Sequence, residues 1–318
     1  MGYGPSSTGG WTKGGGHSRV ARYYGLGAHH VLSARVILAS GDVVVADLCN
    51  NTDLSYAIRG GGSGTYDVTQ MTLKTYPTKN TNVIDVTVND NPINADSSSR
   101  LLYAMTYTYC PFPYLSRVGF GGCGGWALNS SGPIGGGNFT TLYTQSLVNL
   151  EQDSSETTLL FASVATKINP LSKAGFDKSI TQEALSDFGT YFNKNLEASA
   201  VSGFSTLSSR LLGKSALDVS CAELQQVMEM VAEADGKTVY NILVHHGLEE
   251  PPVVRDKTAA VQPGWYNSVV LDIFERPILV ESIEAELLVD MRQNILPIYQ
   301  KLSPNTGRLH ERSGLGRR

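Results

Sequence analysis

The sequence predicts an α+β fold, because strand and helix patterns mix along the chain without the repeated βαβ rhythm of a parallel-sheet protein. A hairpin near the start supports this class, since the apolar runs 31–39 and 43–48 flank the short turn Ser40-Gly41-Asp42. The chain has 318 residues, 41% of them hydrophobic, which is enough for one large or two ordinary domains.

After the hairpin, the pattern predicts a short helix over residues 53–59. Asn51 or Thr52 can cap its start, and Asp53 lies in the first turn, where a carboxylate is favourable. Gly60 then ends the helix. Residues 68–76 return as a strand.

The composition of residues 77–96 predicts a domain boundary, because Pro, Asn and Asp recur there around one short strand at 83–88. Further along, Ser220 and Glu223 form a capping box that predicts a helix reaching Ala234. The remaining expected elements are helices at 98–109, 150–165, 181–196 and 278–301, and strands at 118–126, 139–145, 238–245 and 268–274.

Composition argues against several classes of partner. The formal net charge is −4, so no basic surface favours nucleic acid. No apolar run reaches the roughly 18 residues of a membrane-spanning helix. The four cysteines lie far apart, without CxxC or metal-ligand spacing, so we expect no metal site and buried thiols, with one disulfide as the alternative: Cys49, Cys110, Cys123 and Cys221.

Three N-glycosylation sequons occur in the chain: Asn50-Asn51-Thr52, Asn129-Ser130-Ser131 and Asn138-Phe139-Thr140. They are a weak indication of secretion, and no signal peptide opens the chain.

Two glycine clusters stand out before residue 77: Gly14-Gly15-Gly16, and Gly60-Gly61-Gly62 with Gly64. Main-chain N–H groups in such loops can hold anions such as phosphate. The common nucleotide motifs fail, however: no lysine stands in Walker register, and Arg19 occupies the last glycine position of a Rossmann fingerprint. The nucleophile-elbow motif G-x-S-x-G fails as well, because Thr65 occupies the position two residues after Ser63 where the motif needs glycine. From the residues alone, a flexible loop remains the alternative.

A set of ordered blocks gives the clusters a second interpretation. The blocks are GGW-x-x-GGGHS at 9–18, YGLG at 24–27, D-L-x-x-A-I-RGGG-x-GT-Y at 53–66 and T-x-K-x-YP at 72–77. Together they resemble the later half of the FAD-binding domain in the vanillyl-alcohol-oxidase/PCMH flavoprotein superfamily. Within it, the chain is most similar to fungal berberine-bridge-enzyme-like FAD-linked oxidoreductases of the isoamyl-alcohol-oxidase type. Weaker landmarks follow at 209–212, 260–265 and 302–307.

The resemblance implies an architecture. We expect residues 1–79 to be the C-terminal part of a PCMH-type FAD-binding domain, and residues 80–307 to be an α+β substrate domain with an antiparallel sheet. The family's FAD site has another wall in an earlier segment, and the residues after Gly307 depart from the family pattern. The chain is therefore expected to be truncated at both ends. The full-length parent is expected to be secreted.

The resemblance also implies a cofactor site. FAD would lie against the glycine clusters, with His17 beside the flavin, although a lone loop histidine is more often structural. This is not the histidine that family members bond covalently to flavin. The expected cofactor-binding residues are Gly9, Gly10, Gly15, Gly16, His17, Tyr24, Gly25, Gly27, His30, Val31 and Val68.

The implied chemistry is oxidation of a small alcohol or secondary metabolite by hydride transfer to flavin N5, with molecular oxygen as electron acceptor. The substrate-domain sheet usually supplies the base, and no single residue is singled out among Tyr240, His245, His246, Asp272 and Glu275. The alternative is a catalytically inactive remnant or a binding protein without flavin.

Two departures from the family pattern qualify the resemblance. Asp67 replaces a glycine in a segment one residue shorter than in relatives, and such a deletion flips the faces of the next strand unless it is absorbed. After Gly307 the family continues roughly Ala-Tyr-x-Asn-Glu-Ala-Asp. Codons for the residues from Arg308 onward, read one base later, can encode that run, so 308–318 is expected to be an out-of-frame tail.

Overall fold

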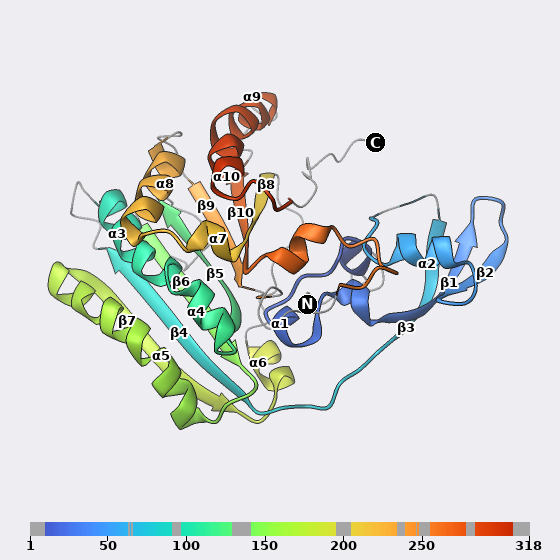
Figure 1. The fold of residues 1–318 in the computed structure, drawn as a ribbon, viewed down its shortest axis with the longest axis horizontal. Coiled ribbons are helices and arrows are strands. Elements are labelled where there is room, and N and C mark those ends of the chain that lie inside the picture. Colours follow the sequence, from blue (N-terminus) through green and yellow to red (C-terminus); the bar gives the residue numbers. More distant parts are fainter. Residues whose placement is uncertain are drawn as a thin grey trace.

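A computed structural model of the chain describes residues 10–62, 64, 66–90, 97–128, 141–194, 205–233, 239–245, 247, 255–277 and 284–307. It contains a three-stranded sheet of order β2-β1-β3 and a seven-stranded sheet of order β7-β4-β6-β5-β9-β10-β8. The two sheets lie at opposite ends of the molecule, joined by the extended segment 74–80 (Figure 1). The predicted α+β class with an antiparallel sheet is confirmed. The division into domains at residue 79 stays a prediction.

The small sheet consists of β1 (Val31–Leu38), β2 (Val43–Asp47) and β3 (Tyr66–Leu73), with α2 (Thr52–Ile58) on one face. The expected hairpin is present, and Gly41 takes the positive φ of 88° that its turn needs. The small-sheet core is made of Ala34, Val36, Ala46 and Ile58.

The ends of α2 follow the predicted signals in part. Asp53 lies in the first turn and Gly60, at φ 104°, lies just past the helix end. Asn51 occupies the N-cap position with φ 48°, but its side chain makes no capping hydrogen bond.

A β-bulge interrupts β3. Its pairing with β1 shifts between Gln70 and Val68, which leaves Thr69 as the extra residue. Val68 and Met71 therefore both pack against the small-sheet core, although they are three positions apart. A one-residue change ahead of a strand requires this kind of adjustment to keep the apolar face inward.

All neighbouring strands of the large sheet are antiparallel. The strands are β4 (Thr81–Asp90), β5 (Gly121–Leu128), β6 (Thr141–Asn149), β7 (Phe176–Leu185), β8 (Ser205–Leu212), β9 (Val239–His245) and β10 (Val270–Pro277).

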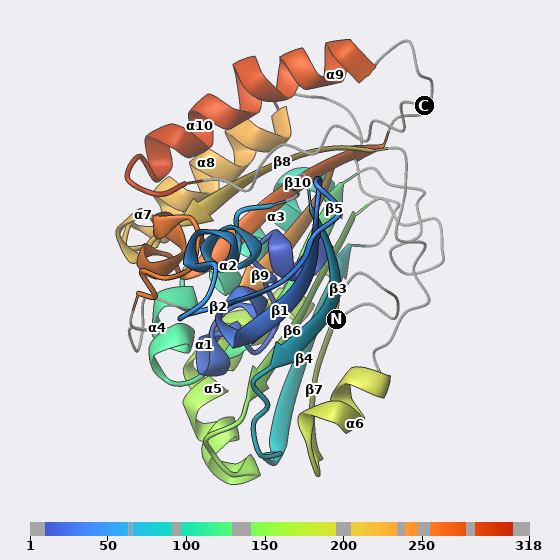
Figure 2. The same ribbon diagram turned by 90° about the vertical axis from the view of Figure 1, so that its right-hand side faces the viewer.

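One face of the large sheet is covered by helices, as the side view in Figure 2 shows. This covered face holds the main core, with Trp126, Tyr143 and Phe274 on the strands and Met105, Phe161 and Met228 on the helices. The helical segments are α3 (Ser97–Tyr109), α4 (Phe112–Arg117), α5 (Ser154–Ile168), η3 (Asn169–Ala174), α7 (Lys214–Leu217), α8 (Cys221–Glu233), α9 (Glu284–Asp290), η6 (Met291–Ile295) and α10 (Leu296–Leu302).

The opposite face of the large sheet, called the open face below, carries much less helix. On this face α1 (Ala21–Tyr24), η2 (Gly27–His30) and η4 (Pro263–Asn267) pack in a second core with Leu211 of β8 and Leu271 of β10. The segment 10–30 therefore precedes the small sheet in sequence but packs on the large one.

One predicted helix is wrong. Residues 181–196 form the end of edge strand β7 and then α6 (Phe188–Lys194), up to the last described residue there. A half-exposed edge strand carries many polar residues, so its period is easily mistaken for that of a surface helix. The true helix start is at Asp187, whose Oδ1 accepts from Thr190 N at 2.8 Å.

The alternative of one disulfide is confirmed, and the expectation of buried thiols is wrong for three cysteines. Cys110, just after α3, and Cys221, at the start of α8, form a disulfide across 111 residues. Cys49 is an exposed free thiol. Cys123 is half-buried on β5.

None of the helices in the described part of the chain combines the length and apolar character needed to cross a bilayer.

Candidate functional site

The glycine-rich segments meet in space through backbone hydrogen bonds. Gly27 N donates to Gly16 O at 2.8 Å, and Ala28 N donates to Gly15 O at 3.0 Å. The second cluster joins them where Gly62 N donates to Lys13 O at 2.7 Å. Segments 13–16, 25–28 and 60–62 therefore form one unit, called the glycine cluster below.

Close packing explains why glycine is needed at two of these positions. A Cβ on Gly16 would lie 2.9 Å from Gly27 Cα, and a Cβ on Gly27 would lie 2.3 Å from the Trp11 ring. Gly16 also has a φ of 76°, in the left-handed region. These two glycines are required by packing within the protein.

Two other glycines have room for a Cβ. Gly15, at φ 105°, and Gly62, at φ 86°, would each carry a Cβ with no heavy atom within 4 Å. Glycine is required at both positions by conformation. Gly62 is half-buried and Gly15 is buried, so of these two glycines Gly62 is the one with main chain at the surface.

His17 lies at the end of the first glycine run. Its ring stacks on Trp265 of η4 with centroids 6.3 Å apart, and its carbonyl accepts from Trp11 Nε1 at 3.2 Å. Burial lowers the pKa of His17 to about 4, because desolvation disfavours the imidazolium. His17 is therefore neutral at pH 7.

Tyr24 and His30 form an aromatic group with Tyr76. His30 Nε2 donates to the Tyr24 carbonyl at 2.8 Å, while the Tyr24 and Tyr76 rings lie 4.4 Å apart. Desolvation raises the pKa of Tyr24. The segment 24–30 is thus fixed against Tyr76, which lies just after the end of β3.

His29, which sequence reasoning did not select, connects this loop to the large-sheet side. Its Nδ1 accepts from Leu26 N at 3.0 Å, so its Nε2–H faces the Tyr266 hydroxyl at 2.7 Å. Burial lowers the pKa of His29 to about 4, and the nearby Asp256 carboxylate only partly opposes this. Gly25 must be glycine here, since a Cβ would lie 2.5 Å from His29 Nδ1.

Arg59 is the other functional candidate that the sequence did not indicate. Its Nε donates to Ala28 O at 3.2 Å and its Nη1 to Thr258 Oγ1 at 2.6 Å, while its Nη2 pairs with Asp256. Its carbonyl accepts from Ala260 N at 2.9 Å. Arg59 thereby connects the end of α2, the glycine cluster and the loop 256–260. Its place in the RGGG block was the available signal.

The remaining predicted cofactor residues lie around this unit or outside it. Gly10 O accepts from Gly14 N at 2.9 Å, and Val31 begins β1 opposite Leu73. Val68 packs in the small-sheet core instead of joining the glycine cluster. Gly9 lies outside the described residues.

The glycine segment is also attached to the open face. Arg19 donates to the Tyr191 hydroxyl and lies 5.4 Å above its ring. The same hydroxyl is 2.7 Å from Ser146 Oγ on β6. These contacts fix segment 10–30 to the large sheet.

Strand register separates the candidate bases by face. Asp272 lies on the covered face, fully buried, and accepts from Tyr109 Oη at 2.7 Å. His245 pairs with Val270, a covered-face residue. Because strand positions alternate, Leu271 and Ile273 mark the open face, and Glu275 belongs to their row.

Tyr240 is the Cα partner of Glu275 and shares its row on the open face. Of the five candidate bases, these two positions are on the same face of the sheet as the glycine cluster. His246 lies outside the described residues.

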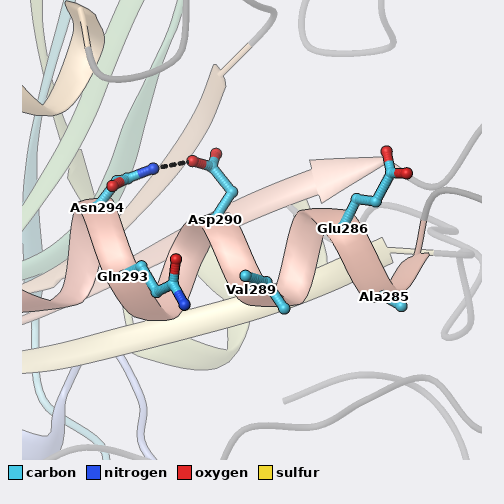
Figure 3. Close-up of a pocket in the computed structure, with 6 residues that line it drawn as sticks. All are labelled: Ala285, Glu286, Val289, Asp290, Gln293 and Asn294. Atoms are coloured by element: carbon cyan, nitrogen blue, oxygen red, sulfur yellow. Dashed lines mark hydrogen bonds between the residues drawn. The ribbon is translucent and has the colours of Figure 1, made fainter.

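A shallow pocket of about 380 Å³ lies on α9 and η6, whose lining residues project from one helical run (Figure 3). Asp290 there accepts from Asn294 Nδ2. Figure 2 shows α9 at the top of the molecule beyond β8, away from α1 and α2 of the glycine-rich segments, so this pocket is not part of the candidate site. Among the described residues, no group of three or more His, Cys, Asp or Glu could hold a metal ion.

Comparison with known proteins identifies the relatives of this arrangement. No family model matches the chain. It is 41% identical over 311 residues to the FAD-linked oxidoreductase apf9 of Gibberella fujikuroi, covering 96% of this chain and 52% of apf9. The FAD-linked oxidoreductase hmp9 of Hypomyces subiculosus is 30% identical over 316 residues, covering 95% and 49%.

Solved structures agree. The VAO-type flavoprotein MtVAO713 from Myceliophthora thermophila C1 superposes with a TM-score of 0.83 at 25% identity, covering 95% of this chain and 53% of that one. By sequence the chain is similar to fungal FAD-linked oxidoreductases, and by fold it is similar to a VAO-type flavoprotein. The wild-type BBE-like 1 protein of Physcomitrella patens has a fold similar to that of the chain, with a TM-score of 0.67 at 15% identity over 93% and 62% of the two chains. The chain spans about half the length of the curated relatives it matches.

Proposed function

We propose that this chain forms one wall of an FAD site in an oxidoreductase that oxidises a small alcohol or secondary metabolite. The observation that carries the proposal is the glycine cluster, where segments distant in sequence meet and a Cβ on Gly15 or Gly62 would meet no heavy atom within 4 Å. The 41% identity to an FAD-linked oxidoreductase supports FAD as the ligand. When bound, FAD would accept a hydride at flavin N5, and molecular oxygen would be the final electron acceptor.

The residues of the chain would hold the cofactor mainly by backbone groups. A cofactor phosphate can approach the main chain at the half-buried Gly62, and the space beside the buried Gly15 can admit a ligand atom, because no side chain intervenes at either glycine. His17 offers a neutral imidazole next to this surface and adds no positive charge at pH 7. Trp265 supports the histidine ring from the large-sheet side.

The substrate proton would be taken up on the open face. Tyr240 and Glu275 are opposite each other in the register of β9 and β10, and we assign the proton-accepting role to this pair. Asp272 is excluded by its place in the covered-face core, where Tyr109 donates to it.

A titration of the purified chain with FAD, followed by flavin absorbance and fluorescence, tests the cofactor assignment. We expect saturable binding, weakened about tenfold or more by Gly15→Ala, which corresponds to about 1.4 kcal/mol. Gly41→Ala is a matched control, because Gly41 also has a positive φ of 88° and a new Cβ there would likewise meet no heavy atom within 4 Å. It lies in the hairpin turn of the small sheet, so it carries the same backbone strain without touching the proposed site.

The alternative function, an inactive remnant or a binding protein without flavin, makes the opposite prediction. A folded chain that leaves the flavin spectrum unchanged at saturating FAD contradicts the proposal. So does an equal effect of Gly15→Ala and Gly41→Ala, because binding would then not depend on the glycine cluster.

A further inference from the structure

The sequon Asn50-Asn51-Thr52 lies in the exposed turn between β2 and α2. The other two sequons lie outside the described residues. We propose that Asn50 is an N-glycosylation acceptor and that its glycan covers the outer edge of the small sheet.

The geometry of the turn is compatible with a glycan on Asn50. The Asp47 carboxylate supports the turn by accepting from Cys49 N and Asn50 N, each at 2.7 Å. Asn50 Nδ2 also donates to both Asp47 oxygens at 3.1 Å. A glycosylated amide nitrogen keeps one N–H, so one of these last two bonds can persist and the backbone contacts are unaffected.

A second, independent observation concerns the compartment. The Cys110–Cys221 disulfide is typical of proteins that fold in an oxidising compartment such as the endoplasmic reticulum. Asparagine glycosylation takes place in that same lumen. The bridge lies on the covered face of the large sheet, so it is structurally unrelated to the sequon.

The surface next to Asn50 explains what a glycan would do. β2 is an edge strand, and Figure 1 shows it at the end of the molecule remote from the large sheet. Val43, Val45 and Leu48 on and beside this strand are 52%, 49% and 60% exposed. An exposed apolar edge strand is a template for pairing with another chain. A hydrated glycan at Asn50 would hinder such pairing sterically.

The modification is a glycosyl transfer from a lipid-linked oligosaccharide. A bond forms between Asn50 Nδ2 and the anomeric carbon of the first sugar, while the bond from that carbon to the lipid pyrophosphate breaks. The amide nitrogen loses one proton, and the lipid pyrophosphate leaves. No electrons are exchanged with another reagent.

The test is expression of the full chain through a fungal secretory pathway behind a cleavable signal, followed by peptide mapping of cell extract and medium. Digestion with a peptide N-glycosidase in heavy-oxygen water converts a glycosylated asparagine into labelled aspartate. We expect the label on Asn50 in the wild-type chain and in Thr52→Ser, which keeps the sequon. It should be absent in Thr52→Val, which removes the sequon but leaves Asn50 in place.

An unlabelled Asn50 in wild-type protein from both fractions overturns the proposal, as does a label on Asn50 that survives in Thr52→Val. Aggregation of the secreted chains on gentle heating tests the shielding role. Thr52→Val should aggregate sooner than Thr52→Ser, while the two chains made in bacterial cytoplasm, without glycan, should aggregate alike. Equal aggregation of the secreted pair contradicts the shielding role and leaves the acceptor assignment to be decided by the peptide map.

Discussion

The guanidinium of Arg59 pairs with the carboxylate of Asp256, 197 residues further along the chain. Arg59 is only 5% exposed, and Asp256 is 27% exposed. The pair fixes the end of the small-sheet helix to the loop that leads into η4. A buried guanidinium that loses its counter-charge is costly, because its desolvation is no longer compensated.

We therefore expect Asp256→Asn to lower the free energy of unfolding by about 1–3 kcal/mol. Arg59→Lys should also destabilise, because lysine cannot bond the Ala28 carbonyl and Thr258 at once. Urea denaturation measures both.

The exposed pair Lys194–Glu183 is the control for the Arg59–Asp256 pair, with side chains 57% and 42% exposed. Lys194→Met should change stability by at most about 1 kcal/mol. Equal effects at the two pairs would show that burial of Arg59 does not matter.

His29 predicts a pH dependence of stability. Burial lowers its pKa from the ordinary 6.5 to about 4. Between these values the unfolded chain binds a proton that the folded chain does not, so stability is complete above pH 6.5 and falls as the pH drops toward 4. His29→Gln should flatten this part of the profile of unfolding free energy against pH. His17 acts in the same direction, so a residual slope should persist until it too is replaced.

The neighbouring His30→Gln serves as control for removing a histidine from the same turn. A wild-type profile that is flat from pH 7 to 4 contradicts the assignment of neutral, buried imidazoles.

Reduction of the Cys110–Cys221 bridge should destabilise the protein. Opening a loop of 111 residues costs about 5 kcal/mol in the chain-entropy model. Thermal unfolding with and without reductant, and of Cys221→Ser, measures the loss. Cys49→Ser should change stability by less than about 0.5 kcal/mol, because this thiol is exposed. Coincident melting of oxidised and reduced protein would contradict a stabilising bridge.

Gly27→Ala tests the packing inside the glycine cluster. The new methyl would lie 2.3 Å from the Trp11 ring, so we expect a loss of about 1–3 kcal/mol from overpacking. The double variant Gly27→Ala with Trp11→Phe should recover part of it, since the smaller ring leaves room. No recovery, measured by denaturant midpoint, would place the strain elsewhere.

Asp272 should behave as a core residue. Tyr109→Phe, which removes one of its hydroxyl donors, is expected to cost about 1–3 kcal/mol of stability. FAD affinity of the folded variant should stay at the wild-type value, in contrast to Gly15→Ala. A selective loss of flavin binding in Tyr109→Phe at unchanged stability would return Asp272 to the candidate site.

Local signals in the sequence were sufficient for several elements. The Ser220 capping box is present, with Glu223 N 3.2 Å from Ser220 Oγ and Ser220 N 2.9 Å from Glu223 Oε2. The hairpin turn and the glycine after α2 were equally local, because each depends on residues within one turn. Edge strand β7 was missed because its faces are both partly exposed, so its pairing with β4 carried the information.

The site could be predicted only as far as its motifs reach. Blocks of glycine indicated the cluster, but the hydrogen bonds that assemble it join residues on three separate loops. The roles of His29 and Arg59 depend on Tyr266 and Asp256, which lie 237 and 197 positions away. No spacing rule connects such positions, and only the folded chain brings them together.

Segment 10–30 precedes the small sheet in sequence, yet it is built into the open face of the large sheet through Arg19 and the second core. A recombination breakpoint in residues 74–80 would therefore not produce two parts that related proteins could exchange independently. In such a chimera, the glycine loops of one parent protein would pack against the seven-stranded sheet of the other parent, to which they are not adapted. We therefore expect recombination between related genes to keep the glycine loops and the seven-stranded sheet together.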